Sequence, residues 1–334
     1  MLCSKQFKCW GKFLIGLVAF GGILLWWRLY RTPVRVTDYY MGTFFTITAY
    51  GPRVKSGVDA AMREIARIEA LTTGSRGPVA ELNNNTGRWM RVPGELYRLL
   101  QRVDTYRSAT DGYFEPAIGS LVELWGFGYG GEGQLPTLYR IQEETARLSQ
   151  PGLEFRKNSR EVRLRPRTKL DLGGVAKGYA VDRAVEVLRQ YGVRSALVNG
   201  GESSIRALGT RPGGAPWRIG LPHPRNKDWI GVFELPGGMA MGTSADTQRY
   251  FIRNGRRYSH LINPKTGYPP EDVYWVSVLA PSALQADVYS TAVFVCEGED
   301  RLEVLRQWNV EGAVVPAKGD VQMTQEYRNC LRDK

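Results

Sequence analysis

The sequence predicts an α+β fold in which helices pack on mixed sheets. Runs with a period of two residues and runs at helical spacing follow one another without the regular strand–helix alternation of a doubly wound sheet. No Gly-x-Gly-x-x-Gly motif opens the domain. The chain has 334 residues, of which 43% are hydrophobic and 23% are charged, so it can bury the core of one large domain or of two fused halves.

An apolar segment, FLIGLVAFGGILLWW, occupies residues 13–27. It is shorter than the roughly 20 residues of a full membrane span, but the basic residues on both sides can extend it by snorkelling. No small-residue cleavage site follows Trp27, and both N-terminal cysteines precede the run, which disfavours a cleaved signal peptide and a lipoprotein. Residues 1–30 are therefore predicted to form one transmembrane signal anchor in a bacterial inner membrane, with the rest of the chain facing the periplasm.

Residues 31–40, which include Pro33, are predicted to be a polar linker, and residues 41–334 to form the folded domain. Helical spacing is found at 58–71, at 96–106, at 138–148, and from the 171–175 turn to about Tyr191. The strand-like runs are 44–50, 162–164, 195–201, 217–221, 231–235, 239–243, 258–262, 273–280 and 290–295.

The chain is strongly basic, with a formal net charge of +12. This balance favours anionic ligands or an anionic membrane surface. No dense Lys/Arg run interleaved with aromatics and no zinc or recognition-helix pattern occurs, so nucleic acid is not expected as a partner. Cys296 and Cys330 could pair outside the cytoplasm, although the apolar run around Cys296 favours a buried thiol.

Polar and glycine-rich clusters mark the candidate chemistry. In DLGGVAKG (171–178) two glycines open a helix ahead of Lys177, an arrangement suited to phosphate oxygens, although a tight structural turn explains it equally well. In QADVYST (285–291), Asp287 and Thr291 would share one face of a helix and could offer oxygen ligands to Mg²⁺. By spacing alone, a helix-capping role for Asp287 is the stronger interpretation.

The chain has only two histidines. A multi-histidine metal site is therefore implausible, and any metal would be a hard cation held by oxygen. His260 lies in the polar segment SHLINPKTG and is the candidate general base, whereas His223 lies between two prolines, as in a surface turn.

Seven blocks in this order resemble the ApbE family, the FAD:protein FMN transferases. They are MGTFFTITAY (41–50), DGYFEPAIGSLVELWGFG (111–128), LDLGGVAKGYAVDRA (170–184), LVNGGES, MGTSADTQRYF (241–251), YSHLINPKTGYP (258–269) and the cluster from Asp287 to Thr291. The resemblance covers roughly residues 38–310. It implies an ApbE-like, T-fold-related fold, FAD as the donor, Mg²⁺ as the cofactor, and a Thr or Ser of a target flavoprotein as the acceptor, with release of AMP. Flavin subunits of membrane respiratory complexes are the expected acceptors.

The resemblance also assigns roles to individual residues. Positions that contact FAD in the family correspond to Met41, Ala117, Ile118, Gly119, Asp171, Lys177 and Leu261. Metal positions correspond to Gly174, through its carbonyl, and to Asp287, Ser290 and Thr291. Ser290 replaces an aspartate found in some members and is the weaker ligand. His260 corresponds to the proposed catalytic base.

Three positions depart from the family pattern: Gly74 replaces a frequent aromatic, Asn263 replaces an aspartate, and Ser244-Ala245 replaces Ser-Gly. Two other functions remain open at this point. The chain could hydrolyse FAD to FMN and AMP with water as the nucleophile, or it could bind FAD as a carrier without catalysis.

Overall fold

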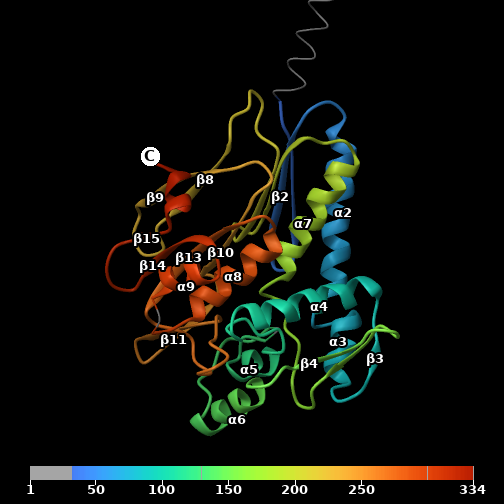
Figure 1. Ribbon diagram of the computed structural model, residues 1–334, viewed down its shortest axis with the longest axis vertical. Coiled ribbons are helices and arrows are strands. Elements are labelled where there is room, and N and C mark those ends of the chain that lie inside the picture. Colours follow the sequence, from blue (N-terminus) through green and yellow to red (C-terminus); the bar gives the residue numbers. More distant parts are fainter. Residues whose placement is uncertain (1–31, 129, 299, 334) are drawn as a thin grey trace, which may run out of the picture.

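The computed structural model describes residues 32–128, 130–298 and 300–333. Its centre is an eight-stranded sheet in which all neighbouring strands are antiparallel (Figure 1). The strand order is β1 (Val34–Tyr40), β2 (Thr43–Tyr50), β6 (Ser195–Gly200), β7 (Ser204–Leu208), β10 (Ala240–Ala245), β13 (Val273–Ala280), β14 (Glu311–Pro316) and β15 (Gln322–Met323).

Three helices pack on one another and on this sheet (Figure 1). They are α2 (Val54–Thr72), α7 (Ala176–Gln190) and α8 (Ala283–Val295). α2 buries the stripe Val58, Met62, Ile65 and Ile68, as its 3.6-residue periodicity predicts. α8 is buried on nearly every side. Gly242 of β10 lets α8 approach closely, because a Cβ there would lie 2.3 Å from the carbonyl carbon of Ala286.

A second layer packs through a further apolar cluster that includes residues of β7, β10, β13 and β14. Its three-stranded sheet consists of β8 (Trp217–Pro222), β9 (Trp229–Leu235) and β16 (Leu331–Arg332). Tyr327 of α10 (Gln325–Asn329) is fully buried in this cluster and its hydroxyl contacts Ser277 Oγ of β13 at 2.9 Å. α9 (Arg301–Gln307) packs against β14.

The remaining elements lie below the sheet in the view of Figure 1. They are α3 (Gly77–Asn84), α4 (Gly94–Ala109), α5 (Gly119–Leu124), α6 (Leu138–Leu148), a sheet of β3 (Met90–Arg91), β5 (Glu161–Leu164) and β4 (Leu153–Arg156), and the hairpin β11 (Tyr250–Arg253)–β12 (Arg256–Ser259). Trp125 ties two of the motif segments together, since its buried indole N–H donates to Gly267 O at 2.8 Å.

Two expectations about secondary structure are wrong. The segment predicted as a linker, 31–40, forms strand β1 from Val34 onward, and it pairs with β2 along its whole length. It reads as polar because β1 is an edge strand with most residues exposed. The strand predicted at 290–295 is the second half of α8, because a short apolar run fits a buried helix as well as a buried strand.

The predicted membrane anchor, residues 1–30, lies outside the described residues. Among the residues that are described, no helix is both long and apolar enough to cross a bilayer. The two C-terminal thiols are not joined by a disulfide. Cys296 is buried and its Sγ donates to Ala292 O at 3.0 Å, as the interpretation as a buried thiol predicts.

Candidate functional site

Asp287 on α8 is the buried centre of the candidate site, with 6% of its surface exposed. Its Oδ2 accepts the backbone N–H of Gly178 at 2.8 Å. The hydroxyl of Ser204 reaches both carboxylate oxygens, at 2.8 and 2.7 Å. Burial raises the pKa of Asp287 to about 7, against the opposing pull of Lys177 and of these donors. Oδ1 bonds only the shared Ser204 hydroxyl, so it keeps a lone pair for a cation.

Three further hydroxyl groups, two on α8 within one turn of Asp287 and one on β10, form a cluster. Ser244 Oγ is 3.0 Å from Ser290 Oγ and 3.3 Å from Thr291 Oγ1. Ser290 also donates to Asp287 O at 3.1 Å, so its hydroxyl is engaged within the protein. The turn before α7 reaches the same place, because a Cβ on Gly174 would lie 3.8 Å from Thr291 Oγ1. The four predicted metal positions therefore meet where α7, α8 and β10 converge.

The donor set fits a hard cation. It offers one carboxylate, hydroxyl oxygens and a backbone carbonyl, which are the ligands that Mg²⁺ takes while water and phosphate complete its shell. Within residues 32–128, 130–298 and 300–333, no group of three or more His, Cys, Asp and Glu side chains is placed to hold a metal. A cation at this site would therefore depend on the single charge of Asp287.

His260 follows directly after the β11–β12 hairpin, whose base it closes. Its backbone N–H donates to Arg249 O at 3.0 Å, and its ring Nδ1 lies 3.1 Å from the same oxygen. A carbonyl can only accept, so Nδ1 carries the proton and Nε2 keeps its lone pair. Loss of hydration lowers the pKa of His260 to about 4, and the charges of Arg249 and Lys177 add to this. The ring is neutral at pH 7.

Two chain segments place the other predicted FAD residues side by side. Gly119 N–H donates to Lys169 O at 2.8 Å, and Asp171 N–H donates to Pro116 O at 2.9 Å. Ala117, Ile118 and Gly119 therefore run alongside Asp171. Asp171 Oδ1 accepts the N–H of Gly173 at 2.7 Å, which shapes the glycine turn that leads into Lys177. Burial raises the pKa of Asp171, while Arg249 opposes the rise.

Met41 lies at the β1–β2 turn with φ = 51°, and its N–H donates to Glu69 Oε1 of α2 at 2.6 Å. Gly201 N–H donates to Phe44 O at 3.0 Å, so this hairpin lies against the turn that leads to Ser204. Met41 is thereby placed at the same end of the sheet as the donor to Asp287. Leu261 is half-buried and packs against the cluster that includes core residues of α8.

Sequence reasoning missed two residues that shape the site. Ser204 lies one residue past the NGGES motif, and its contact with Asp287 spans 83 residues. Asn83 of α3 holds Leu170 next to Asp171: its Nδ2 donates to Leu170 O at 3.0 Å and its Oδ1 accepts Leu170 N–H at 2.7 Å. The sequence carries no signal for Asn83, whereas the second serine of GESS could have been tested for Ser204.

One departure from the family pattern, Asn263, has a structural explanation. Asn263 is buried; its Nδ2 donates to Val295 O at 2.9 Å and its Oδ1 accepts Lys265 N–H at 2.8 Å. An ionised aspartate could make only the second bond. At Gly74 the nearest atom to an added Cβ is Asn83 Nδ2 at 3.9 Å, so a larger side chain would fit.

A surface pocket of about 280 Å³ is lined by two neighbours of His260. Its lining consists of Phe127, Gly131, Glu132, Gln248, Arg249 and Tyr250. The Phe127 ring stands edge-on to the imidazole, with 6.4 Å between the ring centroids, and Arg249 provides the carbonyl that Nδ1 contacts. His260 itself is only partly buried.

The chain is similar in sequence to known proteins. The model of the ApbE family matches residues 41–315. The FAD:protein FMN transferase of Haemophilus influenzae is 30% identical over 275 residues, which make up 79% of each chain. The FAD:protein FMN transferase of Rhodobacter capsulatus is 30% identical over 333 residues, which are 95% of this chain but 61% of the relative.

Solved structures show the same architecture. The ApbE protein of Thermotoga maritima superposes with a TM-score of 0.84 at 30% identity, over 90% of this chain and 100% of that one. The apo flavinyl transferase ApbE of Pseudomonas stutzeri gives 0.79 at 27%, over 90% and 97%. The predicted ApbE-like α+β fold with packed helices is confirmed, although the paired strands of its sheets are antiparallel where mixed sheets were expected. The chain belongs to the ApbE family, as its motifs predicted.

The protonation of His260 can be measured directly. The variant His223→Gln leaves His260 as the sole imidazole, so ring NMR signals follow one residue through a pH titration. We expect a midpoint near 4, with Nδ1 carrying the proton in the neutral form. A midpoint near 6.5, or a proton on Nε2, would contradict the described environment.

Proposed function

We propose that this protein is a Mg²⁺-dependent FAD:protein FMN transferase that attaches FMN through a phosphoester bond to a Thr or Ser of a target flavoprotein. The observation that carries the proposal is that one cation, Lys177, exerts its charge on two groups of opposite kind. One is a buried carboxylate with a lone pair to spare, Asp287, and the other is a neutral imidazole, His260. Membership of a family whose relatives bear this transferase name supports it.

In the proposed reaction the acceptor hydroxyl attacks the FMN phosphorus of FAD. The new bond joins the hydroxyl oxygen to phosphorus, the pyrophosphate P–O bond breaks, and AMP leaves with the bridging oxygen. The hydroxyl proton passes to His260 Nε2. Little covalent chemistry is asked of the protein, so its task is to align the groups and neutralise charge. Gly174, Asp287 and Thr291 would hold Mg²⁺, which neutralises charge on the phosphate oxygens when bound.

The low pKa of His260 fits a base that strengthens when substrate binds. Two of the factors that depress it are the positive charges of Lys177 and Arg249. A bound pyrophosphate would pair with such cations and bring its own negative charge towards the ring. Both effects favour the protonated imidazole, so the pKa rises towards the range useful for general-base catalysis. The acceptor hydroxyl would approach from the side of the pocket that Phe127 and Arg249, two neighbours of His260, line.

The N-terminal segment gives the proposal a location. We place residues 13–27 in the bacterial inner membrane as an uncleaved anchor, with the transferase domain in the periplasm. Strand β1 supports a short tether, because the sheet begins at Val34, a few residues after the apolar run. Flavin subunits of membrane respiratory complexes are the acceptors that such a location would bring within reach.

The proposed metal site can be tested by removing its charge. Asp287→Asn keeps the shape of the side chain but removes the single charge of the cation site. FMN transfer should fall by at least about 10²-fold, because metal neutralisation of a phosphoryl transfer contributes several kcal/mol. Calorimetry measures the loss of Mg²⁺ binding, and mass spectrometry of the acceptor measures the loss of FMN transfer. Asp59→Asn, which breaks an exposed ion pair with Lys55 on α2, is the matched control. Unchanged Mg²⁺ dependence in Asp287→Asn would refute the site.

The second prediction separates the base from the binding groups. His260→Asn should slow transfer to a Thr-containing acceptor by about 10²–10⁴-fold, the usual contribution of a general base. Binding of FAD should change much less, since Lys177, Asp171 and the Met41 turn remain. Single-turnover rates and FAD titrations give the two quantities. Transfer at the wild-type rate in His260→Asn would exclude this base.

The third prediction tests the anchor. The full chain should sediment with membranes, and deletion of residues 1–30 should release an active domain. Reporter fusions after Arg31 should be active only in the periplasm. Recovery of a mature protein that begins near residue 30 in the soluble periplasmic fraction would show cleavage instead, and a cytoplasmic reporter signal would reverse the orientation.

A further inference from the structure

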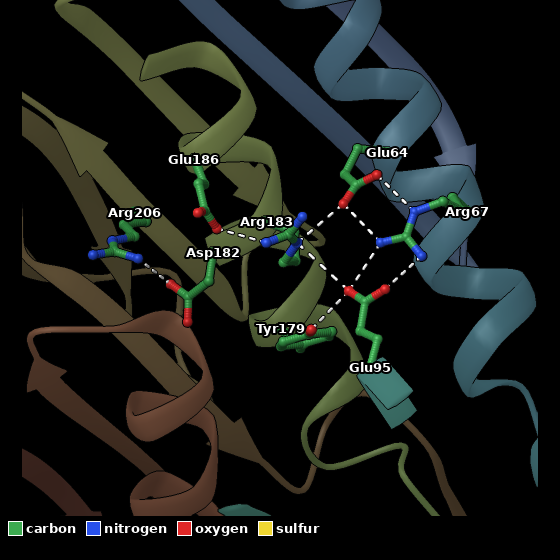
Figure 2. Close-up of polar contacts among 8 residues, drawn as sticks. All are labelled: Glu64, Arg67, Glu95, Tyr179, Asp182, Arg183, Glu186 and Arg206. Atoms are coloured by element: carbon green, nitrogen blue, oxygen red, sulfur yellow. Dashed lines mark hydrogen bonds and ion pairs between the residues drawn. The ribbon is translucent and has the colours of Figure 1, made fainter. Parts of the chain in front are cut away.

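Asp182 of α7 accepts a hydrogen bond from Arg206 of β7 (Figure 2). The same carboxylate holds the start of helix α8. Asp182 Oδ1 accepts the N–H of Ala283 at 2.8 Å, and Oδ2 accepts the N–H of Leu284 at 3.0 Å. Arg206 Nη1 donates to Asp182 Oδ1 at 2.6 Å. First-turn N–H groups of a helix have no partner within the helix and favour negative charge. A carboxylate from a neighbouring helix therefore fixes the end of α8.

The same three elements meet a second time at Asp287. There Gly178 of α7 and Ser204 of β7 are the donors to the carboxylate. Gly178 and Asp182 are four residues apart on a helix, and Ser204 and Arg206 are two apart on a strand. Both spacings return a side chain to the same face of its element. Asp182 and Asp287 are thus two successive carboxylates whose hydrogen bonds link α7, β7 and α8.

Between these two contacts, α7 and α8 are closely packed. A Cβ on Gly178 would lie 2.4 Å from Ala283 O and 2.7 Å from Asp287 Oδ2, so the helices are in contact at the backbone. Closely packed interiors transmit small displacements instead of absorbing them. A shift of the first turn of α8 would therefore reach Asp287 and Thr291, one and two turns further along.

We propose that Asp182 and Arg206 are positioning residues for the cation site: they fix the height and rotation of α8 so that Asp287 and Thr291 face Gly174. The inference rests on the proposed function in one respect, that the Asp287 site binds a divalent cation. Outer partners that orient metal ligands typically affect metal affinity by about 10–100-fold when removed. Asp182 is not one of the predicted metal ligands. It holds the first turn of α8 through the Ala283 and Leu284 amides, and its charge also acts on Asp287, whose pKa is raised first by burial and to a smaller extent by this charge.

The neighbouring residue on α7 provides a contrast. Arg183 turns the other way, towards Glu64 of α2, Glu95 of α4 and Glu186 of its own helix (Figure 2). Its side chain is 30% exposed, against 12% for Asp182 and 14% for Arg206. Loss of one partner from a largely buried pair leaves the other charge uncompensated, whereas an exposed pair contributes little. Glu186→Gln is therefore the matched control.

The test uses Mn²⁺ binding to the chain without FAD, followed by electron paramagnetic resonance, together with amide hydrogen exchange at 283–284. Asp182→Asn should weaken Mn²⁺ binding by about 10–100-fold. It should speed exchange of the Ala283 and Leu284 amides by about tenfold or more, since these amides lose a charged acceptor. Glu186→Gln should change neither quantity. All titrations are run well below the thermal midpoint of each variant, so that a loss of stability alone leaves Mn²⁺ affinity unchanged.

Arg206 supplies a second pair of variants if Asp182→Asn does not fold. Arg206 bonds Asp182 through Nη1, and its buried Nε has no partner. Arg206→Lys should therefore preserve Mn²⁺ affinity that Arg206→Gln loses. Mn²⁺ affinity equal to wild type in Asp182→Asn, or an equal loss in Arg206→Lys and Arg206→Gln, overturns the proposal. If the wild-type chain binds no Mn²⁺, the cation site of the proposed function is refuted. Independently of that result, unchanged amide hydrogen exchange at 283–284 in Asp182→Asn would show that Asp182 does not fix the first turn of α8.

Discussion

The burial of the Asp287 carboxylate is the constraint on which the arrangement of this molecule depends. A buried charge is costly unless donors or a cation compensate it. Here the donors come from α7 and β7, at 2.8 and 2.7 Å. Such short distances leave no room for a side chain between α8 and its neighbours. This explains glycine at 178 and at 242, because a Cβ at either position would lie 2.3–2.4 Å from the backbone of α8. The close packing of the helices on the sheet follows from the same contacts.

The site combines two titratable groups whose pKa values burial moves in opposite directions. It raises the pKa of Asp287 and lowers that of His260, and both shifts disfavour the charged form. The charge of Lys177 acts on both groups. A cation stabilises the charged carboxylate, and an anionic substrate stabilises the charged imidazole. The charge of each group would therefore depend on whether the cation or the anionic substrate is bound, and both groups are less charged when neither ligand is present.

Local patterns predicted much of the fold, and long-range contacts could not be predicted. The bounds expected for one helix, Leu138–Leu148, are those observed, and the β2 alternation and the α2 stripe were also recognisable. Strand β1 was missed because an edge strand buries too little to show alternation. The second half of α8 was misread because a helix buried on nearly all sides has no polar face.

The candidate site shows the same division. Residue types in the motifs pointed to Asp287, Thr291 and His260, and the structure brings the predicted metal positions together. The partners that set their chemistry lie 83 to 109 residues away in sequence, as Ser204 and Gly178 do for Asp287. Their proximity depends on the order of strands in the sheet, which periodicity does not encode. For His260, the Arg249 carbonyl that selects the tautomer is opposite in a hairpin, and only the paired register reveals it.

In the proposed reaction, FAD cleavage is coupled to modification of a protein hydroxyl. The most direct test is the stoichiometry of a single reaction mixture that contains the full chain, FAD, Mg²⁺ and a Thr-containing flavoprotein acceptor. Chromatography counts AMP, and mass spectrometry counts FMN bound to the acceptor. We expect one acceptor-bound FMN for each AMP released. When the acceptor is left out, AMP should be released much more slowly. Release of AMP with free FMN and an unmodified acceptor would contradict it and identify a hydrolase.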